Sequence, residues 1–119
     1  MSDVLNPVEA EGWIRKHADD IARGVVIVSN AHAAFVDADR AYDLAYARKY
    51  MAHEGPAHER RYAADLGTEQ ERVSRDAADV AYQHAKRTAK ALEGPLMAAQ
   101  SISKSVRSMY GAAGVGEGA

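Results

Sequence analysis

The sequence predicts an all-α protein: a long antiparallel helical hairpin with a short elbow helix between its arms. Apolar residues recur at steps of three and four along two long stretches, which is the helical period. Between these stretches, Gly55-Pro56 interrupts the chain. The apolar content is 47%, with 1 Phe and 1 Trp and much alanine, so each helix turn buries little area. Thin faces of this kind favour coiled-coil-like packing and self-association.

The first arm begins at Asn6-Pro7, where asparagine can cap a helix and proline suits its first position. Gly24 costs about 1 kcal/mol inside a helix. The run 25–28 is β-branched, but it has no second strand to pair with. We therefore expect helix, with a kink or break near Gly24 or Asn30, so that 7–53 forms one helix or two. The expected inward residues are Ile14, Ala18, Ile21, Val25, Val28, His32, Phe35, Tyr42 and Tyr46.

The elbow is predicted because a residue that ends one helix is followed by a residue that can begin another. Glycine in Glu54-Gly55-Pro56 supplies a left-handed stop, and proline restarts a helix at its first position. A short helix over 57–66 then ends at Gly67. Thr68, with Glu71 three residues later, has the spacing of a capping box and predicts the start of the second arm.

The second arm is predicted over Thr68 to Tyr110, with a kink or a junction of two helices at Gly94-Pro95. We expect one helical domain over 1–110 and a disordered glycine-rich tail over 111–119. The apolar stripe expected on this arm is Val73, Ala77, Val80, Ala81, Ala85, Leu92, Leu96, Ala99, Ile102, Val106 and Met109.

Composition and the N-terminus indicate a soluble, cytoplasmic protein. The chain has no cysteine, which excludes disulfides and thiolate zinc sites. Its first residues lack the basic and apolar regions of a signal peptide. The longest apolar run, 25–28, is far shorter than the ~20 residues that span a bilayer. We therefore expect no membrane partner.

No catalytic or cofactor-binding pattern is found, so we expect no enzyme activity and no cofactor. His53 and His58 are five residues apart across the Gly-Pro break, whereas a zinc-binding helix needs a spacing of four. An elbow held by polar contacts is the favoured interpretation. The serines near the C-terminus are all distant from any histidine in sequence; they are Ser101, Ser103, Ser105 and Ser108. The glycine-rich tail has no lysine following it, unlike a phosphate-binding loop.

Charge is distributed unevenly along the chain. Residues 1–54 carry nine acidic and six basic side chains, whereas 84–110 carry five basic and one acidic. Three interpretations remain open: a solvated helix face, a helix that docks in a partner's groove, and a phosphate-binding surface. The residues expected to contact a partner or nucleic acid are Lys86, Arg87, Lys90, Lys104, Arg107 and Tyr110.

Three tyrosines at a spacing of four, Tyr42, Tyr46 and Tyr50, lie on one helical face. The favoured interpretation is a packing stripe against the second arm. The alternative is a stacking platform for single-stranded nucleic acid, which would need exposed rings with cations beside them. Asp39 and Asp43 oppose the nearby cations.

Two segments resemble small helical proteins encoded by phages of actinobacteria. They are residues 41–59 (AYDLAYARKYMAHEGPAHE), and Gln100-Ser101-Ile102 followed by 105–110 (SVRSMY). The resemblance covers roughly 21–111, and its most specific parts are the elbow MAHEG and the Gln-Ser-x-x-x-Ser-Val-Arg ending. Gly94-Pro95 departs from the helix-favouring residues of that family. Genes of the family often lie near those for recombination or replication, including single-strand annealing proteins.

Together these features predict a non-enzymatic phage accessory protein that acts by binding. The expected partners are a second copy of the chain and either a phage recombination or replication protein or single-stranded DNA. The alternative is a host-directed inhibitor or modulator that contacts protein and no nucleic acid. A structural virion component is the weakest hypothesis, since nothing in the chain indicates a capsid-like fold.

Overall fold

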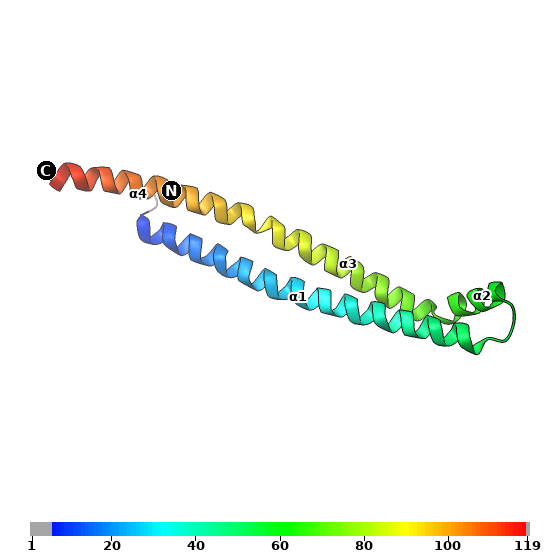
Figure 1. Ribbon diagram of the computed structural model, residues 1–119. Coiled ribbons are helices and arrows are strands. Elements are labelled where there is room, and N and C mark those ends of the chain that lie inside the picture. Colours follow the sequence, from blue (N-terminus) through cyan, green and yellow to red (C-terminus); the bar gives the residue numbers. More distant parts are fainter. Residues whose placement is uncertain (1–5, 119) are drawn as a thin grey trace. The chain divides into compact units, whose positions relative to one another are not determined.

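The computed structural model describes residues 6–118, with side chains described as far as Gly111. Four helices follow in order: α1 (Pro7–Ala52), α2 (Ala57–Gly67), α3 (Glu69–Ala91) and α4 (Glu93–Gly118) (Figure 1). The described residues contain no strand. The prediction of an all-α hairpin with an elbow helix is confirmed. The ends of the predicted domain and tail, 1–5 and 119, lie outside the described residues.

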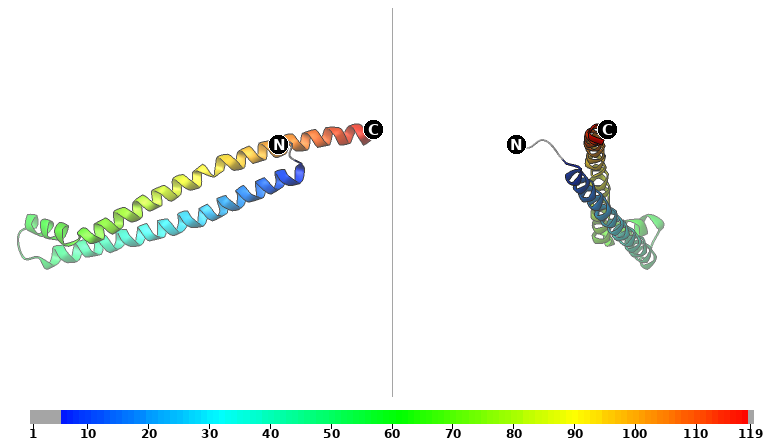
Figure 2. Two further views of the ribbon diagram at one scale, coloured as in Figure 1. Left: turned by 180° about the vertical axis from the view of Figure 1, so that it is seen from behind. Right: turned by 90° about the vertical axis from the view of Figure 1, so that its left-hand side faces the viewer.

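The contacts within the chain group into two units. The terminal unit contains Met1–Val26 and Arg87–Ala119, and the elbow unit contains Ile27–Lys86. In each unit, part of α1 lies antiparallel to a helix from the second half of the chain (Figures 1 and 2). The elbow unit also contains α2. Because α1 and α3 contribute to both units, this grouping does not divide the sequence into successive domains.

Helix α1 is one continuous helix, so the break expected near Gly24 or Asn30 does not occur. At its start, Asn6 Oδ1 accepts a hydrogen bond from the Glu9 amide at 2.8 Å, which confirms the predicted cap. Gly24 is buried in the terminal unit. A Cβ at this position would lie 3.4 Å from Leu92 Cδ1 and 3.5 Å from Ala89 Cβ. Its small size therefore allows close approach of the facing helix.

Two rows of residues on α1 face inward, and both repeat every seven residues. The prediction is correct for the row of large residues but wrong for Ala18, Val25 and His32, which are exposed. Hydrophobicity predicts that Val25 faces inward and Gly24 does not. Close packing of two helices instead favours the smaller residue at the inward position. The large row is Ile14, Ile21, Val28, Phe35 and Tyr42, and the row that the sequence analysis missed is Ala10, His17, Gly24, Ala31, Ala38 and Ala45.

The elbow is held by polar contacts, as predicted. Gly55 has a φ of +149°, a conformation that side chains other than glycine rarely adopt. Its carbonyl accepts a hydrogen bond from Arg60 Nε at 2.9 Å. His53 Nε2 lies 3.6 Å from Glu59 Oε2 across the same turn. The two sides of the Gly-Pro break are thus joined through backbone and side chains.

The capping box predicted at Thr68 is not formed. Thr68 is fully buried, and its hydroxyl donates to the Ala64 carbonyl at 2.6 Å instead of accepting from the start of α3. Thr68 alone separates α2 from α3, so the last turn of α2 offers an acceptor four residues back. The Thr68 carbonyl accepts from the Arg72 amide at 3.0 Å and begins the helical bonding of α3.

The second arm consists of two helices, which was one of the two predicted outcomes at Gly94-Pro95. The break lies at Leu92, whose amide bonds to the Ala89 carbonyl at 3.2 Å. Pro95 therefore falls in the first turn of α4, where a missing N–H costs nothing. Helix α4 is assigned through Gly118 and thus includes most of the predicted disordered tail. Disorder of 111–119 stays a prediction that amide hydrogen exchange can test.

The predicted stripe of the second arm is only partly inward. Ala85, Ala99 and Val106 are buried, and Leu92 and Leu96 are half-buried. The remaining predicted positions do not lie on the inward face, because hydrophobicity alone does not give the angular position of a residue around the helix. Those that lie exposed are Val73, Ala77, Val80, Ala81, Ile102 and Met109. The inward positions that the prediction missed include Thr68, Tyr82, Ala89 and Ser103.

Candidate binding surface

The predicted contact residues lie on the outer faces of the second arm. All six are exposed, and Tyr110 exposes 47% of its surface. Helical spacing places Lys86 and Arg87 each on one face with Lys90, four and three residues away. Lys104 and Arg107 are three apart on α4 and form a second such pair. Lys86 belongs to the elbow unit and the other five to the terminal unit.

The seam of the terminal unit explains why the cations of α3 and α4 point outward. Its inward residues step by three and four through the break, so the helical phase is kept on both sides. Lys90 follows the inward Ala89, and Lys104 follows the inward Ser103 fourteen residues later. Fourteen residues are close to four full turns, so the two lysines occupy equivalent positions relative to the seam. The inward residues of this seam are Ala89, Leu92, Leu96, Ala99, Ser103 and Val106.

The positive charge of these turns is not neutralised locally. The ion pairs in the described part of the chain are Arg23–Asp20, His53–Glu59 and Arg75–Asp76, and none includes a predicted contact residue. Lys86 Nζ lies 5.0 Å from the centre of the Tyr82 ring. The carboxyl end of α3 also carries a partial negative charge that favours its lysines and arginine. The cations of α4 lie away from the end of their helix.

The tyrosine stripe packs within the elbow unit. Tyr42, Tyr46 and Tyr50 are half-buried, with successive ring centres 6.1 Å and 6.4 Å apart. The Arg75 guanidinium lies 4.4 Å from the centre of the Tyr42 ring and covers one face of it. A stacking platform would need this face free for a base. The geometry therefore favours the packing interpretation.

Arg75 is held in place on both sides of its guanidinium. Its Nη2 donates to Asp76 Oδ1 at 3.1 Å. This hydrogen bond raises the pKa of Arg75 above its ordinary value, against the opposing effect of desolvation. The guanidinium therefore remains positively charged over its contact with the Tyr42 ring.

Tyr82 is the aromatic centre of the elbow unit, and sequence reasoning did not single it out. Its ring centre lies 4.9 Å from that of His32 and 6.2 Å from that of Phe35. Tyr82 lies fourteen residues after Thr68, which is two steps of the seven-residue repeat of inward positions. This spacing is the signal in the sequence that could have identified Tyr82.

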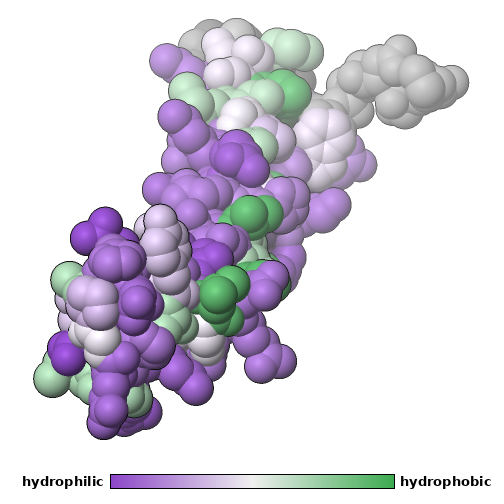
Figure 3. Space-filling model, turned by 90° about the vertical axis from the view of Figure 1, so that its right-hand side faces the viewer, coloured by the Kyte–Doolittle hydropathy of each residue, from purple (hydrophilic) through white to green (hydrophobic). Residues whose placement is uncertain are grey.

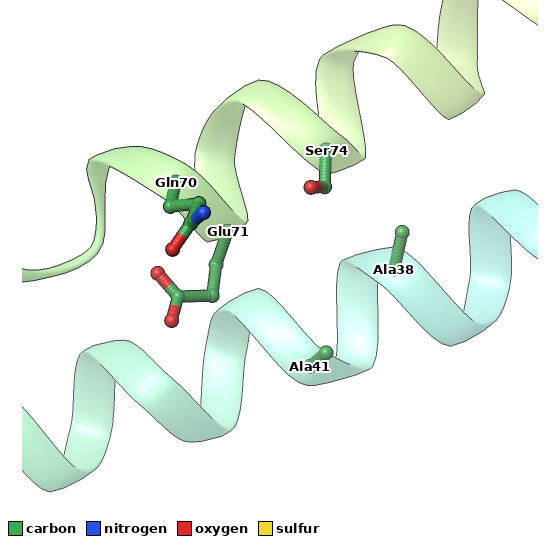
Figure 4. Close-up of a pocket in the computed structure, with 5 residues that line it drawn as sticks. All are labelled: Ala38, Ala41, Gln70, Glu71 and Ser74. Carbon is green, nitrogen blue, oxygen red and sulfur yellow. The ribbon is translucent and has the colours of Figure 1, made fainter.

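Two shallow hollows lie in the elbow unit. One, of about 260 Å³, is lined by Ala38, Ala41, Gln70, Glu71 and Ser74, contributed by α1 and α3 (Figure 4). The other, of about 500 Å³, is lined by Leu66, Gly67, Glu69, Gln70 and Val73. Each contains a single carboxylate as its ionisable group, and neither lining includes a histidine. Across residues 6–118, no three potential metal ligands of the His, Cys, Asp or Glu type come together.

The surface also exposes apolar side chains between charged ones, seen as green atoms among purple in Figure 3. On α1, the side chains of Val25, Val26 and Ile27 expose 62%, 59% and 59% of their surfaces. By length and composition alone, α1 could cross a membrane: an 18-residue window has a mean hydropathy of 1.2, and 6% of that window is buried. The short run 25–28 therefore understates the apolar length of this helix.

No protein-family model matches the chain, and no curated protein and no solved structure matches it.

Proposed function

We propose that this chain is a non-enzymatic accessory protein of an actinobacterial phage, and that it acts by binding DNA during recombination or replication. The observation that carries the proposal is the set of five exposed cations on α3 and α4, none in an ion pair within the described residues. Phosphate groups are the anions that such a surface attracts most strongly. Single-stranded DNA is the proposed ligand.

The outer face of α4 has further chemistry that suits phosphate. Ser101, Ser105 and Ser108 are exposed on the same turns as Lys104 and Arg107. Hydroxyl groups beside cations provide the hydrogen bonds that position a nucleic-acid backbone without reading its sequence. Exposed Tyr110 offers a ring on which one base could stack.

The resemblance of the elbow and of the Gln-Ser-x-x-x-Ser-Val-Arg ending to phage proteins supports the same assignment. Proteins of that family are associated with recombination and replication genes. The proposed location is the cytoplasm of the bacterial host, where both the phage DNA and its recombination proteins are found.

The test is fluorescence anisotropy of labelled single-stranded and duplex oligonucleotides, titrated with the full chain at low salt. The double variant Lys104→Glu, Arg107→Glu should weaken single-strand binding at least tenfold, because two phosphate contacts become repulsive. The matched control is Arg48→Glu, Arg61→Glu, which makes the same change in net charge at exposed positions of α1 and α2. Equal loss in both variants would show a nonspecific charge effect and contradict the assignment of the surface.

A host-directed interaction with protein is the second candidate, favoured by exposed apolar residues on the same turns. Ile102, Met109 and Tyr110 expose 37%, 61% and 47% of their surfaces. An amphipathic helix of this kind fits a hydrophobic groove. This candidate predicts no DNA binding at low salt. It also predicts a specific protein from bacterial lysate that is retained by the native chain and lost with Met109→Glu.

A further inference from the structure

Helix α1 contains a long stretch without any charged residue. None of the thirteen residues from Gly24 to Val36 is Asp, Glu, Lys or Arg. One side of this stretch faces the inner seam, but Val25, Val26 and Ile27 on its other sides are largely exposed. The outer side of α1 thus exposes apolar side chains without a partner in this chain, together with the polar Ser29, Asn30 and His32.

The core of the chain is too small to make this exposure incidental. The buried apolar residues in the described part of the chain are Ala10, Ala64, Ala85, Ala99 and Val106. Four of these five are alanines, whose side chains remove little area from water. Further burial by association would therefore add substantially to the stability of these helices.

The outer face has a symmetric charge pattern. Arg23, Ile27, Asn30, Ala34 and Asp37 follow one another at steps of four and three, and all are exposed. They belong to one unbroken helix, so helical geometry alone places them on one face. Asn30 is at the centre of this outer stripe, with a cation seven residues before it and an anion seven residues after it.

We infer that a second copy of this chain packs along the outer stripe of α1, antiparallel and centred on Asn30. In this pairing, Arg23 of each copy, which also pairs with Asp20 of its own chain, lies opposite Asp37 of the other. A parallel pairing in register would place arginine against arginine and aspartate against aspartate. Charge complementarity therefore selects the antiparallel two-fold arrangement.

The centre of the stripe suits this arrangement as well. Two Asn30 side chains meet at the two-fold axis, where paired amides can hydrogen-bond and fix the register. Ala34 of one copy lies opposite Val26 of the other, which allows the helices to approach closely. The interface uses α1, whereas the proposed DNA contact uses α3 and α4, so failure of one proposal leaves the other standing.

Charge exchange tests the pairing in solution. Sedimentation equilibrium of the full chain should show a dimer. Arg23→Asp or Asp37→Arg alone should raise the dimer dissociation constant at least tenfold, because like charges then face each other. The double variant Arg23→Asp, Asp37→Arg should return it to within about threefold of the native value, since the exchanged charges attract again. Far-UV circular dichroism checks that each variant remains helical.

Crosslinking tests the direction of the helices. The chain has no cysteine, so Asn30→Cys provides a single thiol at the proposed axis. Mild oxidation should link this variant into covalent dimers. The matched control is Ala47→Cys, an exposed α1 position that lies far from its own copy in the antiparallel pairing and should not link.

Three outcomes would overturn the inference. They are a monomer at all concentrations, equal linking of Asn30→Cys and Ala47→Cys, and a double variant no tighter than the single ones. Flotation with phosphatidylglycerol vesicles completes the test. A monomer that floats with these vesicles would assign the apolar face to a lipid surface.

Discussion

The two units use the same seven-residue repeat with side chains of different size. In the elbow unit, aromatic rings cluster along the seam: Tyr82 lies near Phe35 and the exposed His32, and Arg75 lies over Tyr42. The terminal unit has no aromatic–aromatic contact among its described residues. Its seam is instead built from aliphatic and small side chains, among them Ile21, Leu92, Ala99 and Gly24.

This difference separates two ways of stabilising an antiparallel helix pair. Rings bury large areas, so removing one ring removes much of the burial energy. Small residues contribute through close approach, so adding atoms harms them more than removing atoms does. The elbow unit should therefore be sensitive to truncation, and the terminal unit to enlargement.

Truncation in the elbow unit should produce the largest effect. Tyr82→Ala removes the ring that contacts His32 and Phe35, and should lower the free energy of unfolding by about 3 kcal/mol. Urea denaturation followed by circular dichroism measures this at a fixed protein concentration. Tyr62→Ala is the control, because Tyr62 is 65% exposed, and it should cost less than about 0.5 kcal/mol. Equal losses would show that the rings of the elbow unit do not form its core.

Enlarging a side chain in the terminal unit should produce the second-largest effect. Gly24→Leu introduces a side chain where a Cβ alone already touches Leu92 and Ala89, and should cost about 2 kcal/mol. Gly24→Ala adds only that Cβ, at ordinary contact distance, and should stabilise the helix by about 0.5–1 kcal/mol. Opposite signs for the two variants in thermal unfolding support close packing at this site. Stabilisation by leucine would mean that the helices are not close there.

A substitution that strains the backbone of the elbow turn should destabilise the protein. Gly55→Ala places a Cβ on a residue with a φ of +149° and against the Glu59 carboxylate, and should cost about 1–2 kcal/mol. Gly94→Ala serves as the control, because a Cβ there meets nothing within 4 Å and alanine favours the helix. Urea denaturation of both variants tests the turn, and a Gly55→Ala protein as stable as the native chain would show that the backbone at Gly55 can relax.

The smallest effect is expected at Ser103. Its hydroxyl is buried in the terminal unit and makes no hydrogen bond with any described group. Ser103→Ala should therefore change the free energy of unfolding by no more than about 0.5 kcal/mol, with stabilisation the expected sign. A clear loss in calorimetry would mean that the hydroxyl has a bonding partner in solution.

Sequence reasoning located the helices and the elbow because these depend on local signals. Asn6 caps, Gly55 allows a positive φ, and Pro95 limits where a helix can run. It mistook Val25 for an inward residue and overlooked Gly24, because hydrophobicity does not show which face a second helix will cover. The capping prediction failed at Thr68, since the nearby Ala64 carbonyl competed for the hydroxyl.

For the candidate surface, the sequence identified the cations, because charge counting needs no coordinates. It could not show that Lys90 and Lys104 hold equivalent positions across the Leu92 break, since that depends on the phase of α4 relative to α3. Nor could it find Tyr82, whose importance comes from His32 and Phe35, residues distant in sequence.

The salt dependence of single-stranded DNA binding tests the proposed function most directly. If all five exposed cations of α3 and α4 contact phosphates, the logarithm of the association constant should fall against that of salt concentration with a slope of about −3.5. Fluorescence anisotropy with the native chain gives this slope. No binding at low salt, where electrostatic attraction is strongest, would contradict the proposal and direct the search to a protein partner.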